Sequence, residues 1–519
     1  MPLQHGFTSA ARWLADELGL RTMASAGKDV YIIILARYLR LFAYGAVALV
    51  IAIYFEALGF SDEKIGLFMT LTLLGDVIIS LLLTLVADAF GRRRTLLFGA
   101  FMMAMSGMVF ASTDNYIALL LAAIVGVISP TGNEIGPFRA IEESTLAHLV
   151  PEAQRSDVFT WYVVLAVLGT STGLVVGGYA VDVLEAREGW TEVDAYRTIF
   201  WIYTGVGCIK AVMTLFLSRR CESQEKSEQV VDPINGPDEQ QPLLNDPGTP
   251  SQETSSRPRH SRAWLHPFGA ISKQSRWILL KLCSLFFLDS VGSGMAPFSL
   301  INFYMERKFA LAKGKLGGIM SATWFVSTIG NVFASSLAKR LGLIPAMVAT
   351  HLPSSIFLAL LPAPPGLVLT ICLLVGRSVL NSMDQAPRSA FLSLVVLPQE
   401  RTAVMGIVNI LKTLSQSCGP WVTGLLAGHD RFWVAFVVAG SIKAVYDFGL
   451  LALFAGRVHE SRDAKGTSSA NDDDQEGEVA SDSETNETVA QQEDDLVKPS
   501  SESGDSLTVA NYSGTSSQQ

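Results

Sequence analysis

The segment Gly207-Cys208-Ile209-Lys210-Ala211-Val212 recurs, with one substitution, as Gly440-Ser441-Ile442-Lys443-Ala444-Val445. Other landmarks precede both copies in the same order. The matching pairs are Gly75 and Gly330, Glu134 and Asp384, Pro151 and Pro398, Arg155 and Arg401, Gly173 and Gly419, and Gly178 and Gly424. In each copy the arginine lies 18 residues before the first of its glycines and 23 before the second. So many matches in one order indicate an internal duplication of the chain.

Long apolar stretches occupy both copies. Of the 519 residues, 49% are hydrophobic and 17% are charged, whereas soluble domains have about 25% charged residues. A helix needs about 20 apolar residues to cross the core of a bilayer. Twelve stretches approach or exceed that length, at 31–55, 64–86, 95–112, 117–138, 160–182, 198–218, 277–304, 316–338, 344–362, 366–387, 403–427 and 432–455. The sequence therefore predicts an all-α membrane protein with twelve transmembrane helices in two six-helix pseudo-repeats.

Polar segments divide the chain. The stretch between the two copies is rich in Gln, Glu, Ser and Pro, a composition that cannot build a core. The last 57 residues hold 14 Asp or Glu and 2 Lys, a net charge of −12, whereas the whole chain has −9. We expect an N-terminal segment over 1–29, a six-helix bundle over 30–220, a disordered connector over 221–274, a second six-helix bundle over 275–457 and an acidic disordered tail over 458–519.

The basic residues predict the orientation in the membrane. They lie in alternate loops, at Arg92–Arg94, Arg155, Arg219–Arg220, Lys339–Arg340, Arg401 and Arg457. The positive-inside rule places these loops in the cytosol, together with both termini, the connector and the tail. The charge outside the tail is only mildly basic, which excludes a nucleic-acid binder that relies on bulk positive charge.

The connector contains Glu239, Leu243 and Leu244 in the spacing of an acidic dileucine sorting pattern. Such a pattern in an accessible segment predicts binding of sorting adaptors and delivery to a vacuole or another endomembrane. Without sorting, the plasma membrane is the alternative.

The loop after the second span, Thr84-Leu85-Val86-Ala87-Asp88-Ala89-Phe90-Gly91-Arg92-Arg93, resembles the GxxxDRxGR signature of the major facilitator superfamily. The residues that match it are Asp88, Gly91, Arg92 and Arg93, and those that depart from it are Thr84 and Ala89. The resemblance covers about 30–456. It implies a cytoplasmic gate, in which Asp88 caps the N-terminus of a facing helix and Arg92 bridges helices of the first half. Alternatively, the arginines only determine the topology.

Small residues in span 5 form a second motif, at Gly169, Gly173, Gly177 and Gly178. It is similar to the antiporter motif of the superfamily without its proline, and the second copy has Gly419, Pro420 and Gly424. This similarity implies the drug:proton antiporter-like branch, particularly its fungal members. On physical grounds we expect these residues to pack helices closely.

The same stretch contains Ser171 in a GxSxG pattern. That hydrolase motif requires a strand–turn–helix context, whereas Ser171 lies within an apolar span. The chain is therefore not expected to be an enzyme. Because no two histidines have metal-ligand spacing, we also expect no metal and no cofactor.

Ionisable residues within spans are the candidates for a solute or proton site, because each costs about 2.5–3.5 kcal/mol at a helix centre. The candidates for the cavity are Arg37, Arg40, Tyr44, Asp76, Glu134, Asp289, Asp384, Arg388 and Lys412. Proton coupling requires a buried carboxylate, and Asp289, Glu134 and Asp76 are favoured in that order. The competing interpretation is structural ion pairs, such as Arg40 with Glu134 or Asp289, and Lys443 with Asp447 one turn away.

Two parallel repeats with sites near the midplane are typical of secondary transporters. The sequence thus predicts a monomeric carrier that moves a small organic solute across the lipid bilayer by alternating access, coupled to protons. The mid-span cations favour an anionic or zwitterionic solute. Alternatives are a facilitator of an organic anion and a transporter-like nutrient sensor with a signalling tail. The sequence separates neither efflux from organellar transport nor a metabolite from a toxin or drug.

Overall fold

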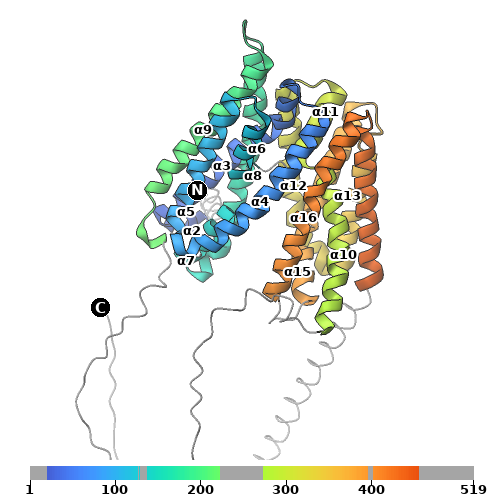
Figure 1. The fold of residues 1–519 in the computed structure, drawn as a ribbon. Coiled ribbons are helices and arrows are strands. Elements are labelled where there is room, and N and C mark those ends of the chain that lie inside the picture. The colour runs from blue at the N-terminus through green and yellow to red at the C-terminus, as the bar shows by residue number, and fades with distance from the viewer. Residues whose placement is uncertain (1–19, 127, 129–136, 222–272, 396–400, 455–519) are drawn as a thin grey trace, which may run out of the picture. The chain divides into compact units, whose positions relative to one another are not determined.

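The computed structural model describes residues 20–126, 128, 137–221, 273–395 and 401–454. The regular elements in these ranges are helices (Figure 1). The chain divides into a unit over Met1–Leu453 and a second unit over Phe454–Gln519, of which only Phe454 is described. The dileucine pattern, the connector after residue 221 and the acidic tail lie outside the described residues.

The first copy contains the helices α2 to α9 and a short 3-10 turn. Their bounds are α2 Leu20–Ser25, α3 Lys28–Ala57, α4 Asp62–Phe90, α5 Arg92–Ser112, α6 Tyr116–Gly126, α7 Pro137–Leu149, α8 Glu152–Glu185, α9 Glu192–Leu215 and η1 Arg219–Cys221. A capping box begins α9, where the hydroxyl of Thr191 accepts from the backbone N–H of Asp194.

The second copy contains α10 to α16 and a C-terminal helix. Their bounds are α10 Lys273–Met295, α11 Phe298–Phe309, α12 Lys313–Leu341, α13 Leu343–Leu360, α14 Leu367–Met383, α15 Gln385–Val395, α16 Arg401–Gly428 and the C-terminal helix Phe432–Phe454.

Eight helical segments in the described part of the chain are long and apolar enough to cross a membrane. Three further helices, α4, α12 and α16, have 28 or 29 residues, and a helix of that length extends for roughly 42 Å. The shorter apolar helix α6 occupies the place of the fourth predicted span. The prediction of an all-α fold is thus confirmed for the described residues, where helices lie at the places of all twelve predicted spans.

Three predicted spans differ from single helices. Span 7 is broken at Ala296 and Pro297, because a proline disfavours helical backbone at the residue before it. Span 10 is broken at Asp384, just before Pro387 in the first turn of α15. In place of span 4, α6 ends at Gly126 and α7 begins at Pro137.

Two glycines in matching loops have the same unusual backbone. Gly91, before α5, has φ of 96°, and Gly342, before α13, has φ of 91°. Side chains other than glycine rarely adopt such angles. The two loops therefore require glycine for the same reason, which supports a common origin of the two copies.

Glycines also bring helices together within and between the copies. A Cβ atom on Gly173 of α8 would collide with the backbone of Phe42 on α3, and one on Gly419 of α16 would collide with Gly294 on α10. A Cβ atom on Gly66 of α4 would lie 2.9 Å from the Cα of Gly424 of α16. Helix backbones approach this closely only where side chains are absent.

Hydrogen bonds join residues of the first copy to the second. Asp182 of α8 accepts from the backbone N–H groups of Lys313 and Gly314 at 2.7 and 2.9 Å, and so caps the N-terminus of α12. A carboxylate is favourable there because the N–H groups of a first helical turn lack partners. The buried Asn302 of α11 donates to the carbonyl of Ala48 of α3 at 3.1 Å.

Two glycines of α16 allow a direct test of this packing. We expect Gly419→Ala to lower the free energy of unfolding by about 1–3 kcal/mol, because backbone atoms of α10 must move. Gly406, in the same helix, has open space where a Cβ would be, so Gly406→Ala should be neutral or stabilise by up to about 1 kcal/mol. Thermal unfolding of the purified protein in detergent measures both. Equal shifts for the two variants would contradict close packing at Gly419.

Candidate functional site

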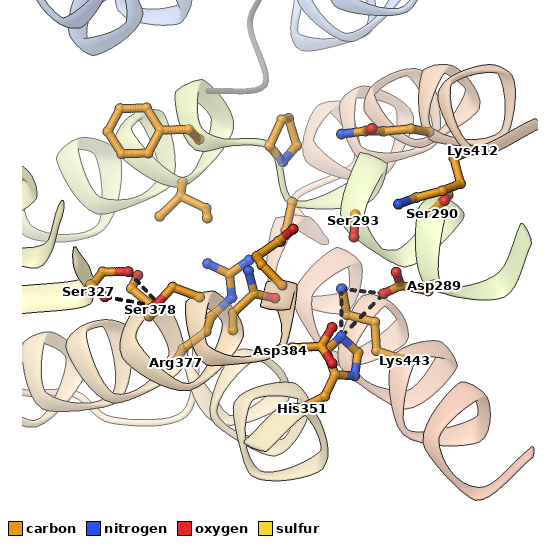
Figure 2. Close-up of a pocket in the computed structure, with 18 of the residues that line it drawn as sticks. Asp289, Ser290, Ser293, Ser327, His351, Arg377, Ser378, Asp384, Lys412 and Lys443 are labelled. Carbon is orange, nitrogen blue, oxygen red and sulfur yellow. Dashed lines mark hydrogen bonds and ion pairs between the residues drawn. The ribbon is translucent and has the colours of Figure 1, made fainter. Parts of the chain in front are cut away.

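A cavity of about 860 Å³ lies among the helices of the second copy (Figure 2). Helices α10 to α16 and the C-terminal helix form most of its wall, and among the described residues of the first copy only Arg139 of α7 lines it. Its volume is within the range of pockets that hold small organic molecules. Both polar and apolar side chains line it.

The buried carboxylate of Asp289, on α10, is the centre of an ion cluster in the wall of this cavity. Its Oδ1 lies 2.8 Å from Nζ of Lys443 on the C-terminal helix, and its Oδ2 lies 2.7 Å from Nη1 of Arg388 on α15. Nε2 of His351, on α13, lies 3.3 Å from Oδ1 (Figure 2). One carboxylate thus joins α10 to three other helices.

Two further carboxylates extend this cluster. Oδ2 of Asp384 lies 2.5 Å from Nη2 of Arg388, which follows it by four residues in the chain. Asp447, which is fully buried, lies 2.8 Å from Nδ1 of His351. The expected pairing of Lys443 with Asp447 is therefore wrong. Lys443 pairs with Asp289 on α10, and the carboxylate of Asp447 contacts the imidazole of His351 instead.

The first copy contains a comparable cluster around Glu142 of α7. Its Oε2 lies 2.7 Å from Nη2 of Arg40 on α3 and accepts from the hydroxyl of Tyr162 at 2.9 Å. Nζ of Lys210, on α9, lies 3.7 Å from Oε1. Arg37 lies over the ring of Tyr162, 3.8 Å from its centre. Arg40 thus pairs with Glu142, whereas Asp289, one of the two partners expected for it, is paired within the second copy. The other expected partner, Glu134, lies outside the described residues.

The two clusters occupy matching positions with the charges exchanged. Arg40 precedes Gly45 by five residues, as Asp289 precedes Gly294. The first glycine packs against α8 and the second against α16, which are the fifth predicted spans of the two copies. Glu142 precedes Arg155 by 13 residues, as Arg388 precedes Arg401. The lysine belongs to the repeated hexapeptide in both. Each half therefore holds one carboxylate between an arginine and a lysine, but the carboxylate has moved from one helix to another.

The cavity brings together only some of the residues predicted to line it. Its lining includes Asp289, Asp384, Arg388 and Lys412. Among the predicted residues that do not line it are Arg37, Arg40, Tyr44 and Asp76. Glu134 lies outside the described residues. Among the residues that sequence reasoning did not assign to the cavity or the clusters are Arg377, His351, Lys443 and Glu142. The repeated hexapeptide marked Lys443 and Lys210, but no pattern in the sequence indicated their partners.

The other predicted motifs have less to do with the cavity. Arg93 donates to the carbonyl of Leu215 at the end of α9, where a cation is favourable. The side chain of Asp88 lies outside the described part. Ser171 is buried inside α8, and so lacks the strand-to-helix turn of a nucleophile elbow.

Neighbouring glutamates test the energetic role of the first cluster. Glu142→Gln removes the negative charge that Arg40 and Lys210 face in a buried site, so we expect a loss of about 3–5 kcal/mol in the free energy of unfolding. Glu143 pairs with Arg139 at 2.7 Å in a partly exposed position, and Glu143→Gln should cost under about 1 kcal/mol. Denaturant titration of the purified protein measures both. Similar losses would show that the cluster is not a buried ion-pair network.

Comparisons with known proteins agree with this architecture. The family model of the Major Facilitator Superfamily matches residues 33–376 and 282–491. The chain is 33% identical to the uncharacterized membrane protein YJR124C of Saccharomyces cerevisiae over 440 residues, which are 83% of this chain and 95% of that protein. It is 22% identical over 190 residues to the quinolone resistance protein NorA of Staphylococcus aureus, 37% of this chain and 45% of that protein.

Solved structures share the fold at low sequence identity. The nucleoside transporter NupG superposes with a TM-score of 0.59 at 15% identity, over 82% of this chain and 99% of that one. A D-xylose–proton symporter superposes with a TM-score of 0.60 at 13% identity, over 81% and 97%. The chain therefore belongs to the major facilitator superfamily, as a multi-pass membrane protein that transports small solutes.

Proposed function

We propose that this transporter is a secondary active carrier, which couples the movement of a small polar organic solute to protons by alternating access. One observation carries the proposal. The carboxylate of Asp289 lies in the wall of the cavity and is paired with Arg388, Lys443 and His351 from three other helices. A proton on this carboxylate removes the charge that joins these helices.

The energy involved is large enough to drive a conformational change. Removing one partner of a buried ion pair costs about 3–5 kcal/mol, and each 1.4 kcal/mol is about tenfold in an equilibrium constant. Protonation of Asp289 can therefore shift the balance between two packings of α10 by more than about a hundredfold. Solute entering the same cavity changes the same contacts, which couples solute and proton.

The finer family placement is part of the proposal. The partial likeness to NorA and the motif in α8 support the drug:proton antiporter-like branch, and the yeast relative supports a fungal origin. We also place 30–220 and 275–457 as two bundles with both termini in the cytosol. The loop with Asp88, Gly91, Arg92 and Arg93 then acts as a cytoplasmic gate, and Glu239, Leu243 and Leu244 direct the protein to a vacuolar membrane.

The proton site can be tested in liposomes loaded with a pH-sensitive dye. Separate pools of organic anions, zwitterions, neutral sugars and amphiphilic cations are added outside. We expect at least one pool to change the internal pH, and Asp289→Asn to abolish that change because its amide cannot gain a carboxyl proton. Labelled solute should still exchange.

A second buried carboxylate supplies the control. Asp447 belongs to the same cluster but does not line the cavity, so Asp447→Asn should keep solute-dependent proton movement. Coupling that survives in Asp289→Asn would refute the assignment. Solute movement without any change of pH in the unaltered protein would indicate a facilitator.

A further inference from the structure

We propose that the solute is an organic anion, whose acidic group binds between Arg377 of α14 and Lys412 of α16. This inference rests on the proposed function in one respect, namely that the cavity of the second copy is the solute-binding site.

The charges in the cavity wall do not balance. Five of the lining residues are lysine or arginine, and two are aspartate. Arg388 and Lys443 are paired with Asp289 and Asp384, and Arg139 is paired with Glu143. Arg377 and Lys412 remain, and their side chains form no ion pair or hydrogen bond with the described residues. Nζ of Lys412 lies over the ring of Phe286, 5.5 Å from its centre.

Two such cations are costly to keep inside a membrane protein. An arginine or lysine at the centre of a membrane helix costs about 2.5–3.5 kcal/mol, and charges of this kind usually have a partner or face a polar cavity that binds a ligand. Figure 2 shows Arg377 on the side of Ser327 and Ser378, and Lys412 on the side of Ser290 and Ser293. The two cations thus line different sides of the same cavity.

The remaining lining residues indicate the rest of the solute. Within the described residues, the side chains of Ser290, Ser293, Asn381 and Gln416 make no hydrogen bond, so their polar groups are available to a ligand. By contrast, the hydroxyls of Ser327 and Ser382 already donate to backbone carbonyls. The apolar part of the cavity wall includes Phe298, Ile301, Met320, Trp324 and Leu374. These features suit a carboxylate or a similar acid on a partly apolar body with hydrogen-bonding groups.

A cationic solute fits the same wall poorly. Both lining carboxylates are already occupied by protein cations at 2.5–2.8 Å. A positively charged solute would have to displace Arg388 or Lys443, and would leave that cation without its partner. Among the described lining residues, the charged side chains that form no ion pair are the cations Arg377 and Lys412.

The sign of the cavity's potential can be measured without knowing the solute. We would replace the native cysteines by serine in the full chain and introduce Ser293→Cys as a reporter in the cavity. The thiol is then reacted with two methanethiosulfonates of similar size, one with a sulfonate and one with a trimethylammonium group. We expect the sulfonate reagent to be favoured, and the ratio of the two rates to fall by on the order of tenfold in Arg377→Gln and again in Lys412→Gln.

A matched control removes a cation elsewhere. Lys339, exposed near the end of α12, does not line the cavity, and Lys339→Gln should leave the ratio unchanged. Arg377→Lys keeps the charge and should retain most of the preference, which separates a loss of charge from a loss of folding. A faster reaction of the cationic reagent, a ratio that ignores both substitutions, or a reporter that reacts with neither reagent would overturn the inference.

Solute pools in the dye-loaded liposomes separate this inference from the proposed function. Transport of anions without proton movement would refute the coupling of solute to protons but would agree with the anion site. Proton movement driven only by neutral or cationic pools would refute the anion site and leave the coupling standing. If both proposals hold, only the anionic pool changes the pH, and this change is lost in Lys412→Gln.

Discussion

A carboxylate buried between an arginine and a lysine is the interaction that holds the inner helices of each half. Glu142 does this in the first half and Asp289 in the second, and their partners come from helices far apart in the sequence. Water is scarce at this depth, so each charge depends on its partner for solvation. The helices that contribute these side chains cannot move independently of one another. A movement of one of these helices relative to the others would therefore separate buried charges.

The exchange of charge between the halves makes their two ion clusters different in composition. At two of three matching positions the sign is reversed, while the lysine of the repeated hexapeptide is unchanged. Changing only one member would have left like charges buried together, so the reversal preserves one carboxylate against two cations. In the second half the carboxylate lies in a cavity wall and is extended by His351, Asp384 and Asp447. The pseudo-symmetric fold thus carries an asymmetric site.

Local features of the chain were sufficient to predict the fold. Length and apolarity located the membrane spans, since a bilayer requires a minimum helix length. The repeated landmarks identified the duplication, and Gly91 and Gly342 have the same left-handed backbone in their matching loops. Less was predictable where one span consists of two helices. The break at Pro297 has a local cause in the proline, whereas the helices that α10 and α11 contact depend on packing.

The sequence by itself determined that this is a duplicated, all-helical membrane protein of a transporter family, and it identified Asp289, Asp384, Arg388 and Lys412 as ionisable residues within spans. Only the tertiary structure decided which charges meet. Lys443 pairs with Asp289, 154 residues away, and not with Asp447 one turn along its own helix. Arg40 pairs with Glu142, 102 residues away. The physical reason is that a helix leaves each side chain facing whichever helix packs beside it, and sequence spacing within one helix contains no information about that neighbour.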